Sequence, residues 1–258
     1  MAGSKPHTLQ VTCANCGLQR ICFPRGLTQQ EIVRLDAILQ SQPVVGKGEA
    51  VFKQGEAARA IFALKSGVVK LCRYDRAGNE IIHTFYLPGD VIGLEALDQP
   101  VYQYDAIALD RCNLCRVEVA DLDRLAQQMP NLNRQVLQMM RRELELERAH
   151  FENVSSRSAD QRLAHFVWHI AERFRDRGYA MDTFQLPILH RDIATHLGLT
   201  PETVSRILRK FHQQGILTWQ RKQVTLHDPC AVRELAGIEA PHASGEGEVC
   251  PVCQAHVG

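Results

Sequence analysis

Residues 190–212 read HRDIATHLGLTPETVSRILRKFH, a pattern of two short helices joined by a sharp turn. Gly198 supplies the turn, Thr200 suits the N-cap of the second helix, and Pro201 suits its first helical position. The residues expected to be buried recur at helical spacing: Ile193, Ala194, Leu197, Val204, Ile207, Leu208 and Phe211. A close-packed helix pair with a glycine in the turn predicts a helix-turn-helix.

The opposite face of the second helix carries side chains that suit DNA. Arg206 matches the guanine acceptors O6 and N7, Glu202 can accept from cytosine N4, and Ser205 can bond to a base or a phosphate. Residues 216–228, ILTWQRKQVTLHD, predict a hairpin wing whose basic tip would meet phosphates. The expected DNA contacts are Glu202, Ser205, Arg206, Arg209 and Lys210 on the helix, and Arg221 and Lys222 on the wing.

Charge is unevenly distributed along the 258 residues, although the formal net charge is only +1. Residues 1–154 carry 18 basic and 18 acidic side chains, whereas residues 155–232 carry 11 basic and 7 acidic ones. Residues 233–258 hold one Arg and four Glu. The total excludes a uniformly basic coat for nucleic acid, but the local surplus lies in the segment with the helix-turn-helix.

The first half of the chain is dense in short strands. Residues 60–75, AIFALKSGVVKLCRYD, and 80–94, EIIHTFYLPGDVIGL, are separated by turn signals with no helix between them. This density predicts an antiparallel barrel or jelly roll, and with the later helices an α+β fold class. The expected divisions are a cysteine loop (1–26), a β-roll (27–127), a dimerisation helix (128–154), a winged helix-turn-helix domain (155–238) and a flexible tail (239–258).

A long helix is expected after Pro130, with its apolar residues on one narrow stripe. The stripe predicts a coiled-coil seam and a homodimer, and packing of the helix on its own barrel is the alternative. Glu147 falls on this stripe. At the edge it would stay in water, whereas inside the seam it would keep dimerisation marginal, because buried like charges repel. The expected dimer contacts are Leu132, Val136, Met140, Leu144, Glu147 and Phe151.

Nine cysteines are an unusual number, and three of them lie within ten residues in the spacing C-x2-C-x5-C. The N-terminus lacks the apolar stretch of a signal peptide, so we expect a cytoplasmic protein in which disulfides rarely persist. Such a loop can wrap a metal centre that takes a fourth ligand from elsewhere, and spacing alone fits both zinc and an iron–sulfur cluster. The candidates for the fourth ligand are Cys72, Cys112, Cys115, Cys250 and Cys253.

The order of barrel, long helix and winged helix-turn-helix resembles the superfamily of the cyclic-AMP receptor and the fumarate–nitrate reduction regulator, over about residues 10–238. The cysteine spacing and the run Glu202-Thr203-Val204-Ser205-Arg206, similar to an E-x-x-S-R base-reading motif, place it nearest the oxygen-sensing fumarate–nitrate reduction branch. This resemblance implies an oxygen-labile [4Fe-4S] cluster, dimerisation when the cluster is intact, palindromic DNA sites of the TTGAT–ATCAA type, and contact with RNA polymerase. The implied ligands are Cys13, Cys16, Cys22 and a fourth cysteine best matched by Cys115, with Cys112 as the alternative.

The sequence departs from the nucleotide-binding members of that superfamily. Those relatives carry an Arg-Ser pair that clamps the phosphate, whereas residues 93–109, GLEALDQPVYQYDAIAL, contain no Arg. We therefore expect no cyclic AMP, although another small ligand is left open. The tail motif of Cys250 and Cys253 could bind zinc, but a flexible tail explains it more simply.

The expected function is an oxygen-responsive, dimeric transcription regulator of anaerobic gene expression, and not an enzyme. No nucleophile–base constellation is evident, and neither C-x2-C opens a helix in a βαβ context, as a thiol–disulfide enzyme requires. No apolar run is long enough to span a bilayer. The rival interpretation keeps the fold but gives the cysteines a zinc ion with a structural role, and takes a small molecule in the barrel as the signal.

Overall fold

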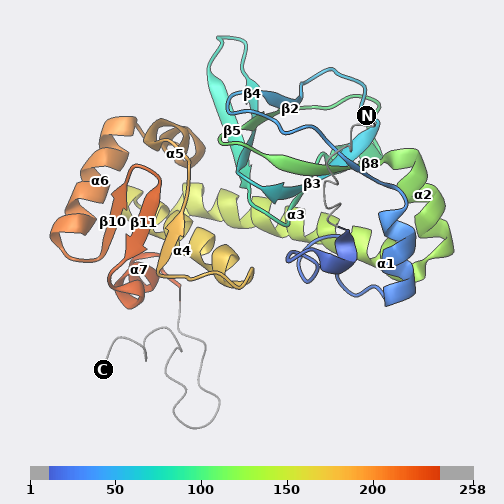
Figure 1. Cartoon of the computed structure of the whole chain (residues 1–258). Coiled ribbons are helices and arrows are strands. Elements are labelled where there is room, and N and C mark those ends of the chain that lie inside the picture. The colour runs from blue at the N-terminus through green and yellow to red at the C-terminus, as the bar shows by residue number, and fades with distance from the viewer. Residues whose placement is uncertain (1–11, 239–258) are drawn as a thin grey trace, which may run out of the picture.

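The computed structural model describes residues 12–238 and shows a β-roll, a long helix and a helical domain with a small sheet (Figure 1). This arrangement confirms the expected α+β class. The predicted tail, with Cys250 and Cys253, lies outside the described residues. Within residues 12–238, no helix combines the length and the apolar character needed to cross a membrane.

Two four-stranded antiparallel sheets, in the orders β1-β8-β3-β6 and β2-β7-β4-β5, form the β-roll. Their strands are β1 (Leu39–Ser41), β2 (Ala50–Phe52), β3 (Ala60–Ser66), β4 (Val69–Tyr74), β5 (Glu80–Tyr86), β6 (Val91–Ile92), β7 (Asp105–Ala108) and β8 (Asn113–Glu118). Large apolar side chains such as Phe62, Leu64 and Leu114 fill the interior. The short 3-10 helix η2 (Leu94–Leu97) follows β6. Two helices, α1 (Gln29–Asp36) and α2 (Val119–Gln128), accompany the roll, and Thr28 and Glu31 form a capping box at the start of α1.

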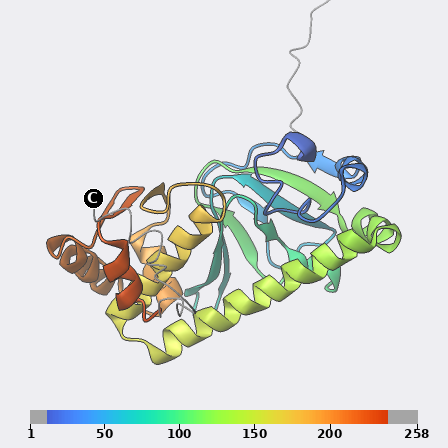
Figure 2. The same cartoon turned by 90° about the horizontal axis from the view of Figure 1, so that it is seen from below.

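The long helix α3 (Pro130–Ser156) begins with a proline, which needs no hydrogen-bond partner at that position. Its 27 residues extend about 40 Å at the usual rise per residue. Figure 2 shows α3 passing under the β-roll and reaching the helical domain. It therefore connects the β-roll to the helical domain.

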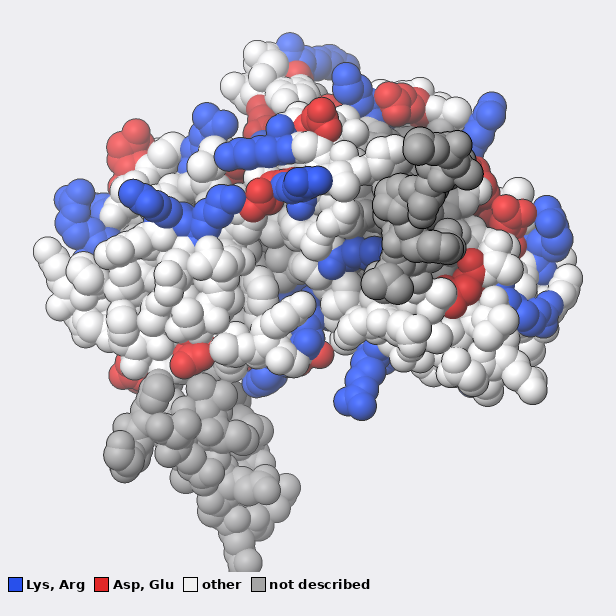
Figure 3. All heavy atoms as spheres, viewed as in Figure 1, with Lys and Arg blue, Asp and Glu red and all other residues white. Residues whose placement is uncertain are grey.

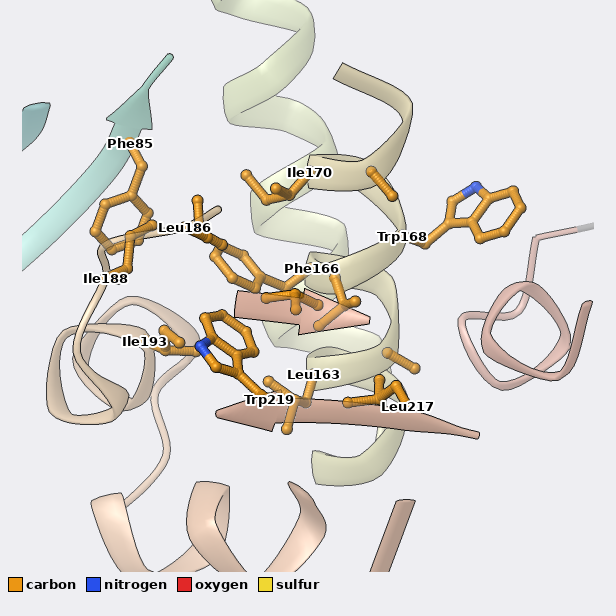
Figure 4. Close-up of a cluster of buried hydrophobic side chains, with 14 of the residues drawn as sticks. Phe85, Leu163, Phe166, Trp168, Ile170, Leu186, Ile188, Ile193, Leu217 and Trp219 are labelled. Atoms are coloured by element: carbon orange, nitrogen blue, oxygen red, sulfur yellow. The ribbon is translucent and has the colours of Figure 1, made fainter. Parts of the chain in front are cut away.

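The helical domain contains α4 (Ala159–Arg175), α5 (His190–Leu197), α6 (Pro201–Gln213) and α7 (Pro229–Leu235). A three-stranded sheet in the order β10-β11-β9 completes it, with strands β9 (Thr183–Gln185), β10 (Leu217–Gln220) and β11 (Gln223–Leu226). Figure 4 shows side chains from α4, α5 and β10 meeting in one core, and Phe85 of β5 pointing toward it. The domain therefore packs directly on the outer face of the β-roll.

Candidate metal centre and nucleic-acid interface

The N-terminal cysteine segment is fixed to the β-roll by its apolar residues. It starts with the 3-10 helix η1 (Cys13–Asn15) and continues in successive turns, with the amide of Cys22 donating to the Leu18 carbonyl at 3.0 Å. Leu18 and Phe23 are buried, and the backbone amide of Cys13 donates to Asp36 of α1 at 2.7 Å. The loop therefore has a defined conformation against the barrel.

Cys13, Cys16 and Cys22 line one cavity of about 130 Å³ together with Cys115. Cys115 comes from β8, where it pairs with Ala63 of β3 and Ser41 of β1. A residue nearly a hundred positions away along the chain thus reaches the loop because β8, an inner strand of this sheet, borders the same cavity.

Cys112 lies elsewhere. It is fully buried in the interior of the β-roll, where its thiol donates to the backbone carbonyls of Val68 at 3.4 Å and Asp110 at 3.3 Å. It does not line the cavity that holds the other four thiols. Of the two candidates for a fourth ligand, the geometry therefore favours Cys115.

Burial controls the ionisation of these thiols. It raises the pKa of Cys22 to about 12, and that of Cys13 well above its usual range, with the nearby Asp36 carboxylate adding to the effect at Cys13. Burial also raises the pKa of Cys115, against the opposing charge of Lys65. The three thiols are therefore protonated at pH 7 unless a cationic centre supplies compensating positive charge, because metals bind the thiolate.

The donor set consists of sulfur atoms, which suits zinc or an iron–sulfur cluster. Within residues 12–238, no three His, Cys, Asp or Glu side chains converge on a point that could hold a single metal ion. The four cysteines line one cavity, and in a cluster each thiolate would bind a different iron. The chemistry of the donors and their common cavity therefore fit a [4Fe-4S] group.

The helix-turn-helix has the predicted local structure. Gly198 adopts the left-handed conformation (φ +63°) that ends α5, and the Thr200 hydroxyl accepts from the Thr203 amide at 3.2 Å to cap α6. The apolar side of α6 is buried, whereas Glu202, Ser205, Arg206 and Arg209 are exposed. Figure 3 shows Lys and Arg side chains gathered along the upper edge of this domain. The exposed face of α6 can therefore approach an anionic surface.

The other three expected DNA contacts differ in their surroundings. Arg221 stands at the wing tip with φ +56°. Lys210 forms an ion pair with Asp160 of α4, and Lys222 forms one with Asp110 of the β-roll at 2.7 Å. These lysine side chains remain about half exposed, at 54% and 49%.

The expected dimer stripe is divided between two environments. Leu132 is fully buried in the core of the β-roll, and Val136 packs partly against that core. Leu132 is therefore a contact within the chain rather than a seam residue, because the start of α3 lies on its own barrel. Farther along, Met140, Leu144 and Phe151 are exposed, and so are Glu147 and Leu137, an apolar residue absent from the predicted set. Positions 137, 140, 144, 147 and 151 follow one helical spacing, so this spacing could have assigned Leu137 to the stripe.

Comparisons with known proteins place these features in a family. Residues 161–235 match the Crp-like helix-turn-helix domain, and residues 43–129 match the cyclic nucleotide-binding domain. The chain is 35% identical to the transcriptional activator protein anr of Pseudomonas aeruginosa, over 88% of this chain and 93% of that protein. It is 32% identical to the fumarate and nitrate reduction regulatory protein of Escherichia coli K12, over 88% and 91%. The structure of FixK2 from Bradyrhizobium japonicum superposes with a TM-score of 0.70 at 28% identity, over 78% of this chain and 99% of that one.

Proposed function

Since the chain belongs to the family of the fumarate and nitrate reduction and Anr regulators, and is thus a DNA-binding transcription regulator of anaerobic genes rather than an enzyme, we propose that it is a dimer that senses oxygen through a [4Fe-4S] cluster. The observation that carries this proposal is the common cavity of Cys13, Cys16, Cys22 and Cys115. Burial raises the pKa of three of these thiols, so they can be held as thiolates only if a bound cationic centre offsets their charge.

The four cysteines would hold the cluster, and a bound cluster would supply an oxygen-reactive centre. The chain's own contacts connect this centre to α3. Gln135 of α3 donates to the Cys22 carbonyl at 3.4 Å, and Asn131 donates to Glu31 of α1 at 3.2 Å. Arg34 of α1 also contacts Gln128, the last residue of α2, two positions before α3 begins. A change in the loop therefore shifts hydrogen bonds at the first turns of the long helix.

The exposed part of α3 provides the surface for a second copy of the chain. Leu144 is 48% exposed and Phe151 is 68% exposed, and apolar side chains at heptad spacing on a long helix favour pairing with the same stripe. Glu147 on this stripe keeps the pairing weak, since two carboxylates would approach each other. Dimerisation would then respond to small changes at the start of α3.

A dimer presents two α6 helices to successive major grooves, about 34 Å apart, which requires a palindrome. Glu202, Ser205 and Arg206 are the base-reading candidates for a site of the TTGAT–ATCAA type, and Arg209, Lys210, Arg221 and Lys222 would contact phosphates. Contact with RNA polymerase belongs to the same proposal. The proposal includes no cyclic AMP, since residues 93–109 offer no arginine to its phosphate.

Anaerobic purification followed by iron and sulfide counts tests the cluster. We expect a brown protein with about four iron and four sulfide per chain, and a gel shift on the palindrome that is lost in air. Cys115→Ser should lose iron and the air-sensitive gel shift, whereas Cys112→Ala should keep both. A colourless protein with one zinc per chain, or a Cys115→Ser protein that still gains DNA binding only without oxygen, would overturn the proposal.

A further inference from the structure

A second cavity, of about 390 Å³, lies where the β-roll, α3 and the helical domain meet. Five of the eleven histidines of the chain line it. They come from four elements: His83 from β5, His150 from α3, His165 and His169 from α4, and His196 from α5. None of them belongs to the cysteine cavity or to the exposed face of α6.

The imidazoles form part of the contact between the two halves of the chain. The Nδ1 atom of His196 lies 3.2 Å from the Ile82 carbonyl of β5, so Nδ1 carries the hydrogen. The His196 ring also stacks on His150 of α3, with ring centroids 4.1 Å apart and planes 15° apart. His196 therefore links α5 to both the β-roll and the long helix. His165 and His169 face the same cavity from α4.

The surroundings favour neutral imidazoles. Burial, followed by the positive charges of nearby Arg157 and Arg173 and of other histidines, lowers the pKa of His165 to about 4 and that of His169 to about 3. Burial lowers the pKa of His196 to about 3, and it lowers those of His83 and His150 as well. Buried neutral imidazoles that face one cavity are groups that gain protons when they are hydrated in acid.

The charged groups at this junction are mostly cationic or already paired, and two carboxylates of α3 are the exceptions. Arg173 lies on the cavity wall with one of its guanidinium nitrogens, Nε, buried and without a hydrogen-bond partner among the described residues. Its carboxylate partner Asp90 is shared with Arg177. Tyr104 lines the wall, Asp192 on α5 is already paired with Lys70 of β4, and Arg73 and Arg142 add positive charge nearby. The acidic side chains on the wall are Glu143 and Glu147 of α3.

We propose that the five-histidine cavity is a proton-sensitive latch that holds the DNA-binding domain against the β-roll and α3 at neutral pH and releases it on acidification. Protonation of two or more rings places cations next to one another and next to Arg173 in a partly enclosed space. Separation of the domains hydrates the rings and relieves that repulsion. Release of the domain also frees the two α6 helices of a dimer from a fixed spacing, so acid lowers the affinity for a palindrome.

The size of the effect follows from linkage. A histidine with a pKa near 6.5 when released and near 3 to 4 when docked makes the release constant about tenfold larger at pH 5.5 than at pH 7.5. His165, His169 and His196 together give about 1,000-fold. Glu143 acts in the opposite direction, because its pKa is raised to about 7 by burial, so its protonation favours the docked state. If release hydrates Glu143 completely, the release constant is about 40-fold larger at pH 5.5 than at pH 7.5.

The chain contains a probe for release and a matched control. Cys72 lies two residues after Lys70 on β4, and Lys70 pairs with Asp192 of α5. The Cys72 side chain is fully buried in the core that the β-roll shares with the DNA-binding domain. Cys112 is equally buried but belongs to the interior of the β-roll. Release of the domain exposes Cys72, whereas exposure of Cys112 requires unfolding of the roll.

The full chain is labelled with N-ethylmaleimide at pH 7.5 and 5.5, and peptide mass spectrometry gives the labelling rates of Cys72 and Cys112. Each rate is divided by that of the same cysteine in the urea-unfolded chain at the same pH. We expect the normalised rate of Cys72 to rise by about 40-fold to 1,000-fold, with less than a threefold change at Cys112. An unchanged Cys72 rate, or an equal rise at both cysteines, would overturn the latch.

Histidine variants assign the effect to the cavity. His165→Gln should reduce the acid-induced rise at Cys72 by about tenfold, and His169→Gln provides the same test from the other ring of α4. His227→Gln, an exposed residue of the same domain outside the cavity, should leave the rise unchanged. Equal behaviour of the cavity variants and His227→Gln would also contradict the proposal.

Discussion

Replacing Asp90 by Asn should remove a large part of the stability with which the two halves of the chain hold together. Asp90 lies in the turn between β5 and β6 and pairs with Arg173 of α4 and with Arg177, which lies two residues after the end of that helix, the latter at 2.7 Å. It also accepts from the Leu87 amide at 2.6 Å. The side chain of Arg177 is only 1% exposed, and that of Arg173 is 7% exposed. The substitution therefore leaves two buried guanidinium groups without a counter-ion.

Loss of one partner of a buried ion pair costs about 3–5 kcal/mol. At an m-value of about 3 kcal/mol/M, the urea midpoint should fall by about 1–1.7 M. Urea unfolding at pH 7 and one protein concentration measures this change, with Asp123→Asn on the exposed side of α2 as the control, expected within about 0.5 kcal/mol of the parent. A loss of less than about 1 kcal/mol for Asp90→Asn would show that the pair does not hold the domains together.

The pH dependence of the same variant has a defined sign. Burial alone would raise the pKa of Asp90, but the two guanidinium groups hold it below its usual value. A carboxyl group with a depressed pKa stabilises the folded state above its unfolded pKa of about 4, and the contribution is lost as the pH falls through the folded value. The stability difference between the parent and Asp90→Asn should therefore be full at pH 7 and shrink below about pH 4. A difference that grows in acid would contradict this assignment.

Three further predictions concern the recognition helix, the dimer stripe and the β-roll. Arg206→Ala should weaken binding to the palindrome by about 1–3 kcal/mol and relax the preference at one base pair, as measured by gel shifts on base-substituted sites. Leu144→Glu should give a monomer in sedimentation at concentrations where the parent is a dimer, whereas Val33→Glu, exposed on α1, should leave the dimer intact. Gly67→Ala should cost more stability in urea than Gly78→Ala, which should cost about 1 kcal/mol. Both glycines have φ above +80°. A Cβ at Gly67 would lie 2.5 Å from the sulfur of the buried Cys112, whereas a Cβ at Gly78 would have no atom within 4 Å.

The helix-turn-helix could be predicted from the sequence because its signals are local. The cap at Thr200, the turn at Gly198 and the apolar spacing of α6 all fall within about twenty residues, and each has a direct structural meaning. The density of short strands and turn signals, with no helix between them, likewise indicated an antiparallel roll. Pairings between strands are set by contacts between residues far apart in the sequence, so the order β1-β8-β3-β6 could not be predicted from local patterns.

The choice between Cys112 and Cys115 depended on such a distant contact. The two residues are three positions apart along an extended segment, and an odd separation points their side chains to opposite faces. The sequence could show that they diverge, but only the packing of the loop on β8 shows which face meets Cys22. Leu132 was misassigned for a related reason, because helical spacing shows that a face is buried without showing what covers it.

The exposed pair between Lys222 and Asp110 connects DNA binding to the arrangement of the domains. Its side chains are 49% and 36% exposed, and a pair of this kind contributes about 0–1 kcal/mol. A phosphate can therefore take Lys222 from Asp110 at little cost, and DNA binding removes one of the contacts that hold the wing on the β-roll. The contacts that remain include the buried pairs of Asp90 and Asp192, the apolar core shared with β5 and the histidine cavity. Whether the bound dimer keeps its two recognition helices at a fixed spacing thus depends on groups deep in the junction, which DNA itself does not touch.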